Sequence, residues 1–282
     1  MNKKQLKEIE KKLGLDLKKN SDQVFLIDER VAKRQVEYAE ISGEDLVLEV
    51  GAGTGTLTNH ITKRTREKNL TVIEKDPRLV DLLKDRFGEH IKVKLANALE
   101  VEFNDFNKII SNLPYSISSE ITFKFLDYEF DLAILMYQKE FAERMVAEPE
   151  DEMYGRLSVM IELLSDAEIK EIVPQTAFYP RPRVKSAIVQ LTPNKTKYNV
   201  TNLGFFKRFI KAIFTQRRKK IKNSIINTRH IYENEYNGIS KNKREIKKSL
   251  PKTEFDLDKR PEDFNTAELV RLSNQFYDEL YK

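Results

Sequence analysis

The 282-residue chain contains no cysteine. A disulfide framework, a thiolate metal site and a cysteine nucleophile are therefore excluded. No apolar run approaches the roughly 18 residues of a membrane span, and the lysine-rich N-terminus lacks the apolar segment of a secretory signal. Histidine is scarce too, and His60, His90 and His230 have no ligand-like spacing, so we interpret them as surface or structural residues and predict no metal. We expect a soluble cytoplasmic protein.

Positive charge is unevenly distributed along the chain. The formal net charge is +5, yet residues 191–282 carry 21 basic and 11 acidic side chains, and the preceding residues are acidic overall. A basic end suggests a polyanionic partner. Residues 1–20 add seven lysines, and apolar residues recur from Leu6 to Leu17 at helical spacing. Two interpretations of this helix stay open: a solvated helix packed on the body, or an arm that touches nucleic acid.

Strand and helix signals alternate from residue 46 onward. Strands are predicted at 46–50, 70–73, 91–95, 108–111 and 132–137, and helices at 56–66, 77–87, 121–126 and 139–146. Such alternation indicates parallel βαβ units, with 169–173 and 186–191 as late strands at the sheet edge. After a linker at 193–197, helical spacing continues through 205–214 and 269–280. The predicted fold class is α/β, followed by a small all-helical C-terminal domain.

Two features at strand ends point to a nucleotide-like ligand. Gly51, Gly53 and Gly55 follow the first strand, and glycines in such a turn let the backbone approach a ligand closely. Glu74 ends the next strand, 23 residues after Gly51, where a carboxylate can accept hydrogen bonds from ribose hydroxyls. The G-x-G-x-G spacing differs from the G-x-G-x-x-G of dinucleotide-binding proteins, which disfavours a nicotinamide dehydrogenase. The turn alone is also compatible with a structural role.

The tetrapeptide Asn112-Leu113-Pro114-Tyr115, directly after the fourth strand, is the most specific signal. An adenine amino group is a poor nucleophile because its lone pair is delocalised into the ring. The Asn112 side-chain oxygen and the Leu113 carbonyl can accept the amine hydrogens and re-pyramidalise the nitrogen, while Pro114 fixes the backbone. Tyr115 offers a face on which an extruded base can stack. The alternative interpretation is an ordinary turn.

Two further segments complete the candidate site. Phe178 begins a proline-rich loop that reaches Arg183, and its ring can either clamp a base against Tyr115 or plug the core. Between Lys211 and Lys222 six basic residues occur without an acidic one, which favours a phosphate-binding helix over a merely solvated face. The residues predicted to contact RNA there are Arg217, Arg218, Lys219, Lys220 and Lys222.

Together these segments resemble the KsgA-type small-subunit ribosomal RNA adenine dimethyltransferases, in particular their archaeal and eukaryotic branch. The matching stretches are QVFLID at 23–28, GAGTG at 51–55, NLPY at 112–115, LMYQKE at 135–140, YGRLSV at 154–159, FYP at 178–180 and QRRK at 216–219. The resemblance implies a Rossmann-like methyltransferase domain with S-adenosylmethionine as donor. It also implies transfer of two methyl groups to the exocyclic amine of each of two adjacent adenosines near the 3′ end of small-subunit rRNA.

The resemblance also implies roles for individual residues. Val24, Leu26, Gly51 and Gly53 would border the methionine half of the donor, Glu74 its ribose, Asn97 and Ala98 its adenine, and Asn112 the point of methyl transfer, with Phe178 as a second aromatic on the target base. Two residues depart from the family pattern. Val24 stands where bacterial members have a polar residue, and Asn97 where aspartate is common. Because Asn97 can still accept through its oxygen, donor binding is expected to survive.

The sequence therefore predicts a monomer with a basic arm at 1–20, a methyltransferase domain at 21–192 and a basic helical RNA-binding domain at 193–282. A role in small-subunit biogenesis is expected. A large-subunit rRNA methyltransferase of the antibiotic-resistance class is one alternative, although 135–140 and 154–159 favour the small-subunit class. A non-catalytic assembly factor on the same fold is the other, and the intact 112–115 segment speaks against lost catalysis.

Overall fold

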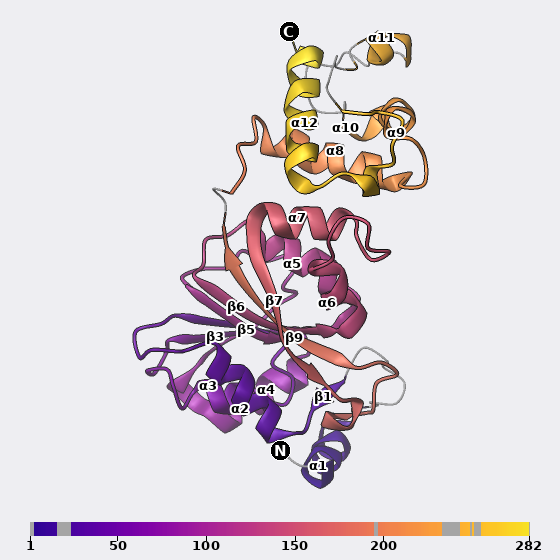
Figure 1. Ribbon diagram of the computed structural model, residues 1–282. Helices are drawn as coiled ribbons and strands as arrows, with labels where there is room; N and C mark the ends of the chain where they lie inside the picture. Colours follow the sequence, from indigo (N-terminus) through magenta and orange to yellow (C-terminus); the bar gives the residue numbers. More distant parts are fainter. Residues whose placement is uncertain are drawn as a thin grey trace. The chain divides into compact units, whose positions relative to one another are not determined.

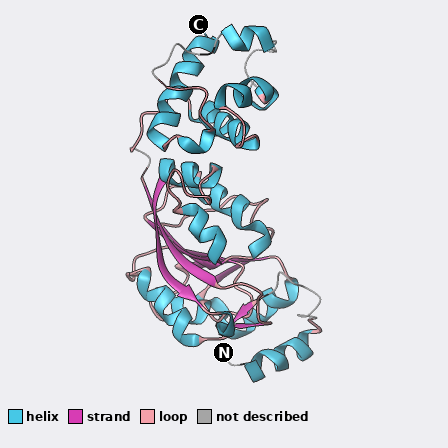
Figure 2. Ribbon diagram, turned by 45° about the vertical axis from the view of Figure 1, so that its right-hand side comes forward, coloured by secondary structure: helices cyan, strands magenta, loops and turns pink. Residues whose placement is uncertain are grey.

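The computed structural model describes residues 3–15, 24–194, 197–232, 243–248, 250 and 255–281. The chain divides into two compact units, residues 1–142 with 167–193 and residues 143–166 with 194–282. The first is an α/β unit and the second is a helical unit (Figures 1 and 2). The sequence placed one boundary near 193, whereas contacts in the structure group residues 143–166 with the later helices.

A seven-stranded sheet forms the centre of the α/β unit, in the order β4-β3-β2-β5-β6-β9-β7. Its strands are β2 (Val47–Val50), β3 (Leu70–Glu74), β4 (Lys92–Leu95), β5 (Lys108–Asn112), β6 (Leu132–Gln138), β7 (Ser165–Val173) and β9 (Ser186–Pro193). Strands β2 to β6 pair in parallel, and β9 joins β6 antiparallel. The predicted parallel sheet with two late edge strands is confirmed. A separate ladder pairs β1 (Phe25–Leu26) with β8 (Phe178–Tyr179), which the sequence did not predict.

Helices cover both faces of this sheet. The helices that begin in the α/β unit are α1 (Lys3–Leu13), α2 (Glu29–Tyr38), α3 (Thr58–Ile61), α4 (Pro77–Phe87), α5 (Ser118–Leu126) and α6 (Lys139–Met145). Figure 1 shows α2, α3 and α4 on one face and α5 on the other. Asp28 and Asp76 begin α2 and α4, because each side chain accepts a hydrogen bond from the backbone N–H two residues later. Such caps fix where the chain leaves the sheet edge.

The strand order reverses at β2, which lies between β3 and β5. In open α/β sheets, ligands bind outside the carboxyl ends of the strands at such a switch point. The sheet interior below this point is apolar, and Val72, Ile110 and Ile134 are completely buried there. Parallel strands covered on both faces are expected to be apolar throughout. Polar residues at the carboxyl ends therefore mark the place to look for function.

The helical unit packs around an aromatic core. Its helices are α7 (Arg156–Leu164), α8 (Leu203–Thr215), α9 (Ile221–Asn227), α10 (Arg229–Tyr232), α11 (Lys243–Lys248) and α12 (Thr266–Tyr281). The ring centroid of Phe276 lies 5.8 Å from that of Phe209 and 5.7 Å from that of Tyr232. The helical spacing predicted for 205–214 and 269–280 is confirmed, because it places these rings on one face of each helix. Within the described residues, no helix combines the length and apolarity that crossing a membrane requires.

The predicted helix at 56–66 is wrong in extent, because only Thr58–Ile61 is α-helical. The hydroxyl of Thr62 donates to the Asn59 carbonyl and that of Thr65 to the Ile61 carbonyl. Such side-chain bonds compete with the helical hydrogen-bond ladder and favour turns. Threonine is also stiff at χ1 and a weak helix former. The apolar spacing in this segment therefore predicted the buried face but not the length.

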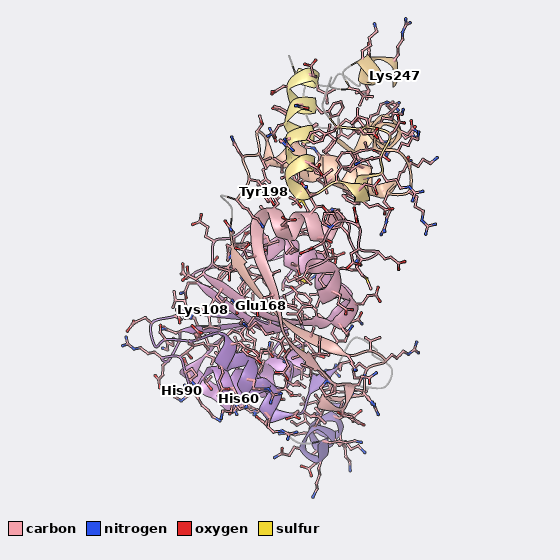
Figure 3. The ribbon with its side chains drawn as sticks, in the orientation of Figure 1. His60, His90, Lys108, Glu168, Tyr198 and Lys247 are labelled. Atoms are coloured by element: carbon pink, nitrogen blue, oxygen red, sulfur yellow. The ribbon has the colours of Figure 1, made fainter. Side chains whose placement is uncertain are left out.

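A buried ion pair joins the start of β5 to the turn before β2. The Lys108 ammonium lies 3.0 Å from an Asp45 carboxylate oxygen, and both side chains are nearly buried (Figure 3). Lys108 also donates to the backbone carbonyls of Ala39 and Glu40 at 2.9 and 2.7 Å. The ammonium thus has a full set of acceptors, as a buried charge requires.

Replacing Lys108 by methionine is expected to lower the free energy of unfolding by about 3 kcal/mol, because it leaves the Asp45 charge buried without its partner. Although burial opposes it, hydrogen bonds from Asn107, Ser42 and Lys108 lower the pKa of Asp45 to about 2. This stabilisation is therefore present above the ordinary carboxyl value of 3.8 and is lost as the pH falls toward 2. Urea unfolding at neutral pH and at about pH 3 measures both effects.

The control is the ion pair between Arg66 and Glu44, whose side chains are 68% and 75% exposed. Arg66→Met is expected to change the free energy of unfolding by less than about 1 kcal/mol. Equal effects of the two substitutions would contradict the importance of burial at Lys108.

Candidate active site

A pocket opens at the carboxyl ends of the central strands of the α/β unit. It encloses about 1180 Å³ including its open mouth, and its walls come from the ends of β2, β3, β5 and β6 together with the β1–β8 ladder. The pocket brings together all the residues predicted for donor and target base: Val24, Leu26, Gly51, Gly53, Glu74, Asn97, Ala98, Asn112, Leu113, Pro114, Tyr115 and Phe178. Parallel pairing explains the convergence, because it aligns the carboxyl ends of β2, β3 and β5 at one edge.

The turn after β2 needs its glycines. Gly51 and Gly53 have φ angles of +71° and +58°, which side chains other than glycine's rarely adopt. A Cβ atom at Gly53 would lie 2.9 Å from the Phe25 ring. One at Gly51 would lie 3.3 Å from the Pro114 ring, so the glycine turn and the 112–115 segment are in direct contact. The turn therefore presents backbone, without side chains, to the pocket.

The Glu74 carboxylate at the end of β3 holds this turn in place. One oxygen accepts a hydrogen bond from the Gly53 N–H at 3.0 Å, and the other accepts from the N–H groups of Lys75 and Asp76 at 2.8 and 3.1 Å. The residue is 6% exposed and lines the pocket. Each carboxylate oxygen has a further lone pair, so Glu74 can accept additional hydrogen bonds from a ligand.

Glu49, one residue before the end of β2, is a pocket-lining acid that sequence reasoning missed. It is 1% exposed, and its carboxylate accepts a hydrogen bond from the Thr58 hydroxyl at 2.8 Å. Burial raises the pKa of Glu49 to about 8, and the neighbouring negative charge of Glu74 adds to the rise. The available signal was an acid inside an otherwise apolar strand, directly before a glycine turn. Two acids in one pocket favour a positively charged ligand.

Asn112 ends β5 and faces the pocket with an unsatisfied oxygen. Its Oδ1 atom is buried and has no hydrogen-bond partner in the described structure. Buried polar atoms nearly always have partners, so an orphaned acceptor in a pocket indicates a place for a ligand donor. The preceding residue is fixed: the Ser111 hydroxyl accepts from the Val50 N–H at 2.8 Å, and the Ser111 carbonyl accepts from the Gln35 amide at 3.2 Å. Asn112 thus projects from a rigid strand end.

The two candidate aromatic residues differ in mobility. Tyr115 lines the pocket, and its hydroxyl is 2.7 Å from the Ser186 hydroxyl, while burial raises its pKa. Phe178 is 5% exposed and packs in the core cluster that contains Leu26, its partner across the β1–β8 ladder. Phe178 therefore serves as a core residue and as pocket wall at once, so the two interpretations drawn from the sequence are not exclusive.

Asn97 occupies an exposed turn at the pocket edge. Its side-chain oxygen accepts from the Leu99 N–H at 3.1 Å, and its amide nitrogen donates to Glu100 at 2.6 Å. The oxygen expected to accept from a ligand is thus already engaged in capping the turn. The adjacent Ala98 is buried and lines the same wall.

The histidines lie on the surface of the α/β unit and take part in ion pairs. His60 lies 2.5 Å from Glu29, and His90 lies 2.9 Å from Glu67 (Figure 3). Among the residues that the structure describes, no three histidine or acidic side chains are arranged to hold a metal ion.

The basic segment of the helical unit is not the continuous helix that the sequence predicted. Helix α8 ends at Thr215 and α9 begins at Ile221, so Arg217, Arg218, Lys219 and Lys220 lie in the turn between them. Gln216 leaves the helical conformation with ψ of +44°, and the Lys219 N–H donates back to its carbonyl. Such a turn replaces the helical ladder.

The absence of acidic partners was also a wrong premise for this segment. Lys220 and Lys222 both contact Asp258, at 2.8 and 2.5 Å, and Arg217 contacts Glu262 at 2.7 Å. These carboxylates come from a distant stretch of the chain, which local charge counting does not detect. Arg218 and Lys219 are exposed and form no ion pair among the described residues.

Comparison with known proteins identifies the kind of chain that carries this pocket. A sequence profile described as ribosomal RNA adenine dimethylase matches residues 14–257. A probable ribosomal RNA small subunit methyltransferase A from Methanosarcina barkeri is 44% identical over 259 residues, which are 91% of this chain and 87% of that protein. Its counterpart from Thermococcus onnurineus is 42% identical over 248 residues, 86% of this chain and 88% of that protein.

Solved structures show the same architecture. A dimethyladenosine transferase from Plasmodium falciparum superposes with a TM-score of 0.74 at 25% identity, over 90% of this chain and 98% of that one. The 23S rRNA methyltransferase ErmE superposes with a TM-score of 0.60 at 26% identity, over 92% of this chain and all of that one. The likeness therefore extends over both units of the chain.

Proposed function

The chain belongs to the ribosomal RNA adenine dimethylase family, and on that premise we propose that it methylates two adjacent adenosines near the 3′ end of small-subunit rRNA. The reaction converts each exocyclic amine to a dimethylamine. The observation that carries this proposal is the buried, unpartnered Asn112 oxygen in a pocket at the strand switch point. The names of the curated relatives support the small-subunit class over the large-subunit class.

S-adenosylmethionine is the methyl donor, and the pocket residues fit it. Its sulfonium and amino groups are positively charged, and the two acids Glu49 and Glu74 line the pocket. The space beside Gly53 would be filled by any Cβ atom, so backbone can approach the donor there. We propose that Val24, Leu26 and Gly51 border its methionine half, Glu74 its ribose, and Asn97 and Ala98 its adenine.

The donor supplies a methyl group on a positively charged sulfur, so the carbon–nitrogen bond forms as the carbon–sulfur bond breaks and the bonding pair returns to sulfur. The enzyme's task is mainly positioning, because charge is lost as the methyl group moves. Asn112 Oδ1 accepts a hydrogen of the target amine and directs the nitrogen lone pair, with the Leu113 carbonyl as second acceptor. Tyr115 and Phe178 hold the ring of the flipped base. The proton leaves the methylated nitrogen for solvent.

Donor affinity is expected to fall as the pH falls below about 8, by up to about tenfold per pH unit, because protonation neutralises Glu49. The positive donor favours the ionised carboxylate, so binding at neutral pH releases a proton. Calorimetry in buffers of different ionisation enthalpy measures the affinity and the proton release together. Glu49→Gln should remove both effects. A pH-independent affinity in the unsubstituted protein would contradict this role for Glu49.

The test of the proposed function is methyl transfer from labelled S-adenosylmethionine to ribosomal subunits that lack these methyl groups. Label on small subunits but not on large subunits is expected. Label on large subunits would favour the large-subunit alternative. Tight subunit binding without donor binding would instead indicate a non-catalytic assembly factor. We also propose that the protein acts as a monomer in the cytoplasm, within small-subunit biogenesis.

The helical unit is proposed to contribute a second contact with rRNA. Arg218 and Lys219 are the exposed cations in the turn before α9 and are available for phosphates. Arg217, Lys220 and Lys222 would have to exchange a carboxylate for a phosphate, so we expect each of them to contribute less.

A further inference from the structure

Helix α1 is attached to the wall of the pocket. Leu6 is completely buried and packs in one cluster with Phe25 and Leu79, both of which line the pocket. Leu15, just after the helix, is buried in the same cluster. Figure 1 shows α1 beside β1. The family profile begins at residue 14, so this helix is an addition of this chain to the part that the profile describes.

A second contact joins α1 to the proline-rich loop on the other side of the β1–β8 ladder. The Lys3 ammonium lies 5.2 Å from the centroid of the Tyr179 ring, and Tyr179 pairs with Phe25. Arg181 and Arg183 follow within four residues and are exposed. Lysine and arginine side chains of the two segments therefore adjoin at the pocket's border.

The exposed lysines of α1 share one face of the helix. Lys4, Lys7 and Lys11 are spaced by three and four residues, opposite the buried Leu6. We call these three lysines, together with Arg181 and Arg183, the rim patch. Its five side chains form no ion pair with a carboxylate in the described parts of the chain; Arg181 contacts only the neutral Gln175, at 3.5 Å. In the helical unit, by contrast, carboxylates neutralise three of the five cations predicted to bind RNA.

We propose that the rim patch binds the phosphates of the rRNA strand on either side of the target adenosine. The inference rests on the proposed function, which requires a base to leave its stack and enter the pocket. The flanking nucleotides must then lie at the pocket's border, where Phe25 and Leu79 connect the wall to α1. Unpaired cations at that place release counterions from the RNA on binding, so the contact is sequence-independent and sensitive to salt.

The test is the double substitution Lys4→Glu and Lys7→Glu, which reverses two charges and leaves Leu6 to anchor the helix. The KM for small subunits is expected to rise about tenfold, and the salt dependence of RNA affinity to weaken by about one to two units of slope. The kcat at saturating subunits and the Kd for S-adenosylmethionine should not change. A fluorescent single-stranded RNA oligonucleotide with two adjacent adenosines reports the RNA affinity directly.

The matched control is Lys63→Glu with Arg64→Glu. These two exposed cations follow α3, and Figure 1 shows α3 well apart from α1 within the same unit. The control reverses the same number of charges, so it should leave the KM and the oligonucleotide affinity nearly unchanged. Equal losses in both variants would show a general effect of net charge and overturn the proposal.

Other outcomes also decide the matter. An unchanged KM in the Lys4 and Lys7 variant, with donor binding intact, would overturn the proposal and leave α1 as a structural cover. A raised KM for subunits with unchanged affinity for the oligonucleotide would indicate a ribosomal protein as partner, and would overturn it too. Absence of methyl transfer by the unsubstituted enzyme would instead contradict the proposed function, and the oligonucleotide measurement would still test the rim patch.

Discussion

Replacing Asn112 by alanine is expected to lower kcat for methyl transfer about 10²–10³-fold, the size of effect seen when one preorganised polar group is removed from an active site. The substitution deletes the buried oxygen that has no partner within the protein. Without that acceptor, the amine lone pair stays delocalised into the adenine ring and is not directed at the methyl group. Single-turnover methyl transfer with saturating subunits and donor measures the chemical step.

Two comparisons make the Asn112 result interpretable. Asn112→Asp keeps an acceptor oxygen at the same strand end and should retain more activity than the alanine variant. Asn104→Ala removes an exposed asparagine on the loop before β5 and should not change kcat. The Kd for S-adenosylmethionine should change little in Asn112→Ala, because most donor contacts come from other strands. Full activity in Asn112→Ala would remove the central residue of the proposed mechanism.

Replacing Glu74 by alanine is expected to raise the Kd for the donor about 100-fold. The side chain has two tasks: it holds the Gly53, Lys75 and Asp76 N–H groups, and it is proposed to accept from the donor ribose. Loss of two hydrogen bonds to a charged acceptor, at about 1.5 kcal/mol each, corresponds to this change in affinity. Isothermal calorimetry with S-adenosylmethionine and with its demethylated product measures it.

The Glu74 result separates binding from chemistry. Because the donor contact is made before and during the reaction, kcat at saturating donor should fall much less than kcat/KM. Glu74→Gln keeps one acceptor oxygen and should be intermediate. Glu120→Ala, at an exposed position in the first turn of α5, serves as the matched control. A donor Kd within about threefold of the unsubstituted value in Glu74→Ala, roughly 0.6 kcal/mol, would exclude Glu74 from the donor site.

The sequence predicted the α/β unit because its signals are local. Apolar runs bounded by turns gave β2 to β6, and parallel pairing alone then brings the ends of β2, β3 and β5 to one edge. The residues after those ends, such as Gly51 and Asn112, could therefore be assigned to one pocket without coordinates. Their roles in binding and transfer stay predictions until they are measured.

What the sequence could not predict depends on contacts between distant segments. The buried state of Glu49, and hence its raised pKa, follows from packing against α3. The partners of Lys220 and Lys222 lie more than thirty residues away, so a local charge count found none. The short α3 reflects threonine hydroxyls that bond to the backbone, an alternative that apolar periodicity does not register.

The most direct test of the central claim is to map methylated nucleotides. Small subunits that lack the two dimethyladenosines are incubated with S-adenosylmethionine and either the unsubstituted enzyme or Asn112→Ala, and the rRNA is digested and analysed by mass spectrometry. The account predicts dimethyladenosine at two adjacent positions near the 3′ end with the unsubstituted enzyme, and a strong loss of both with Asn112→Ala. Methyl groups on other nucleotides, or equal modification by both proteins, would contradict it.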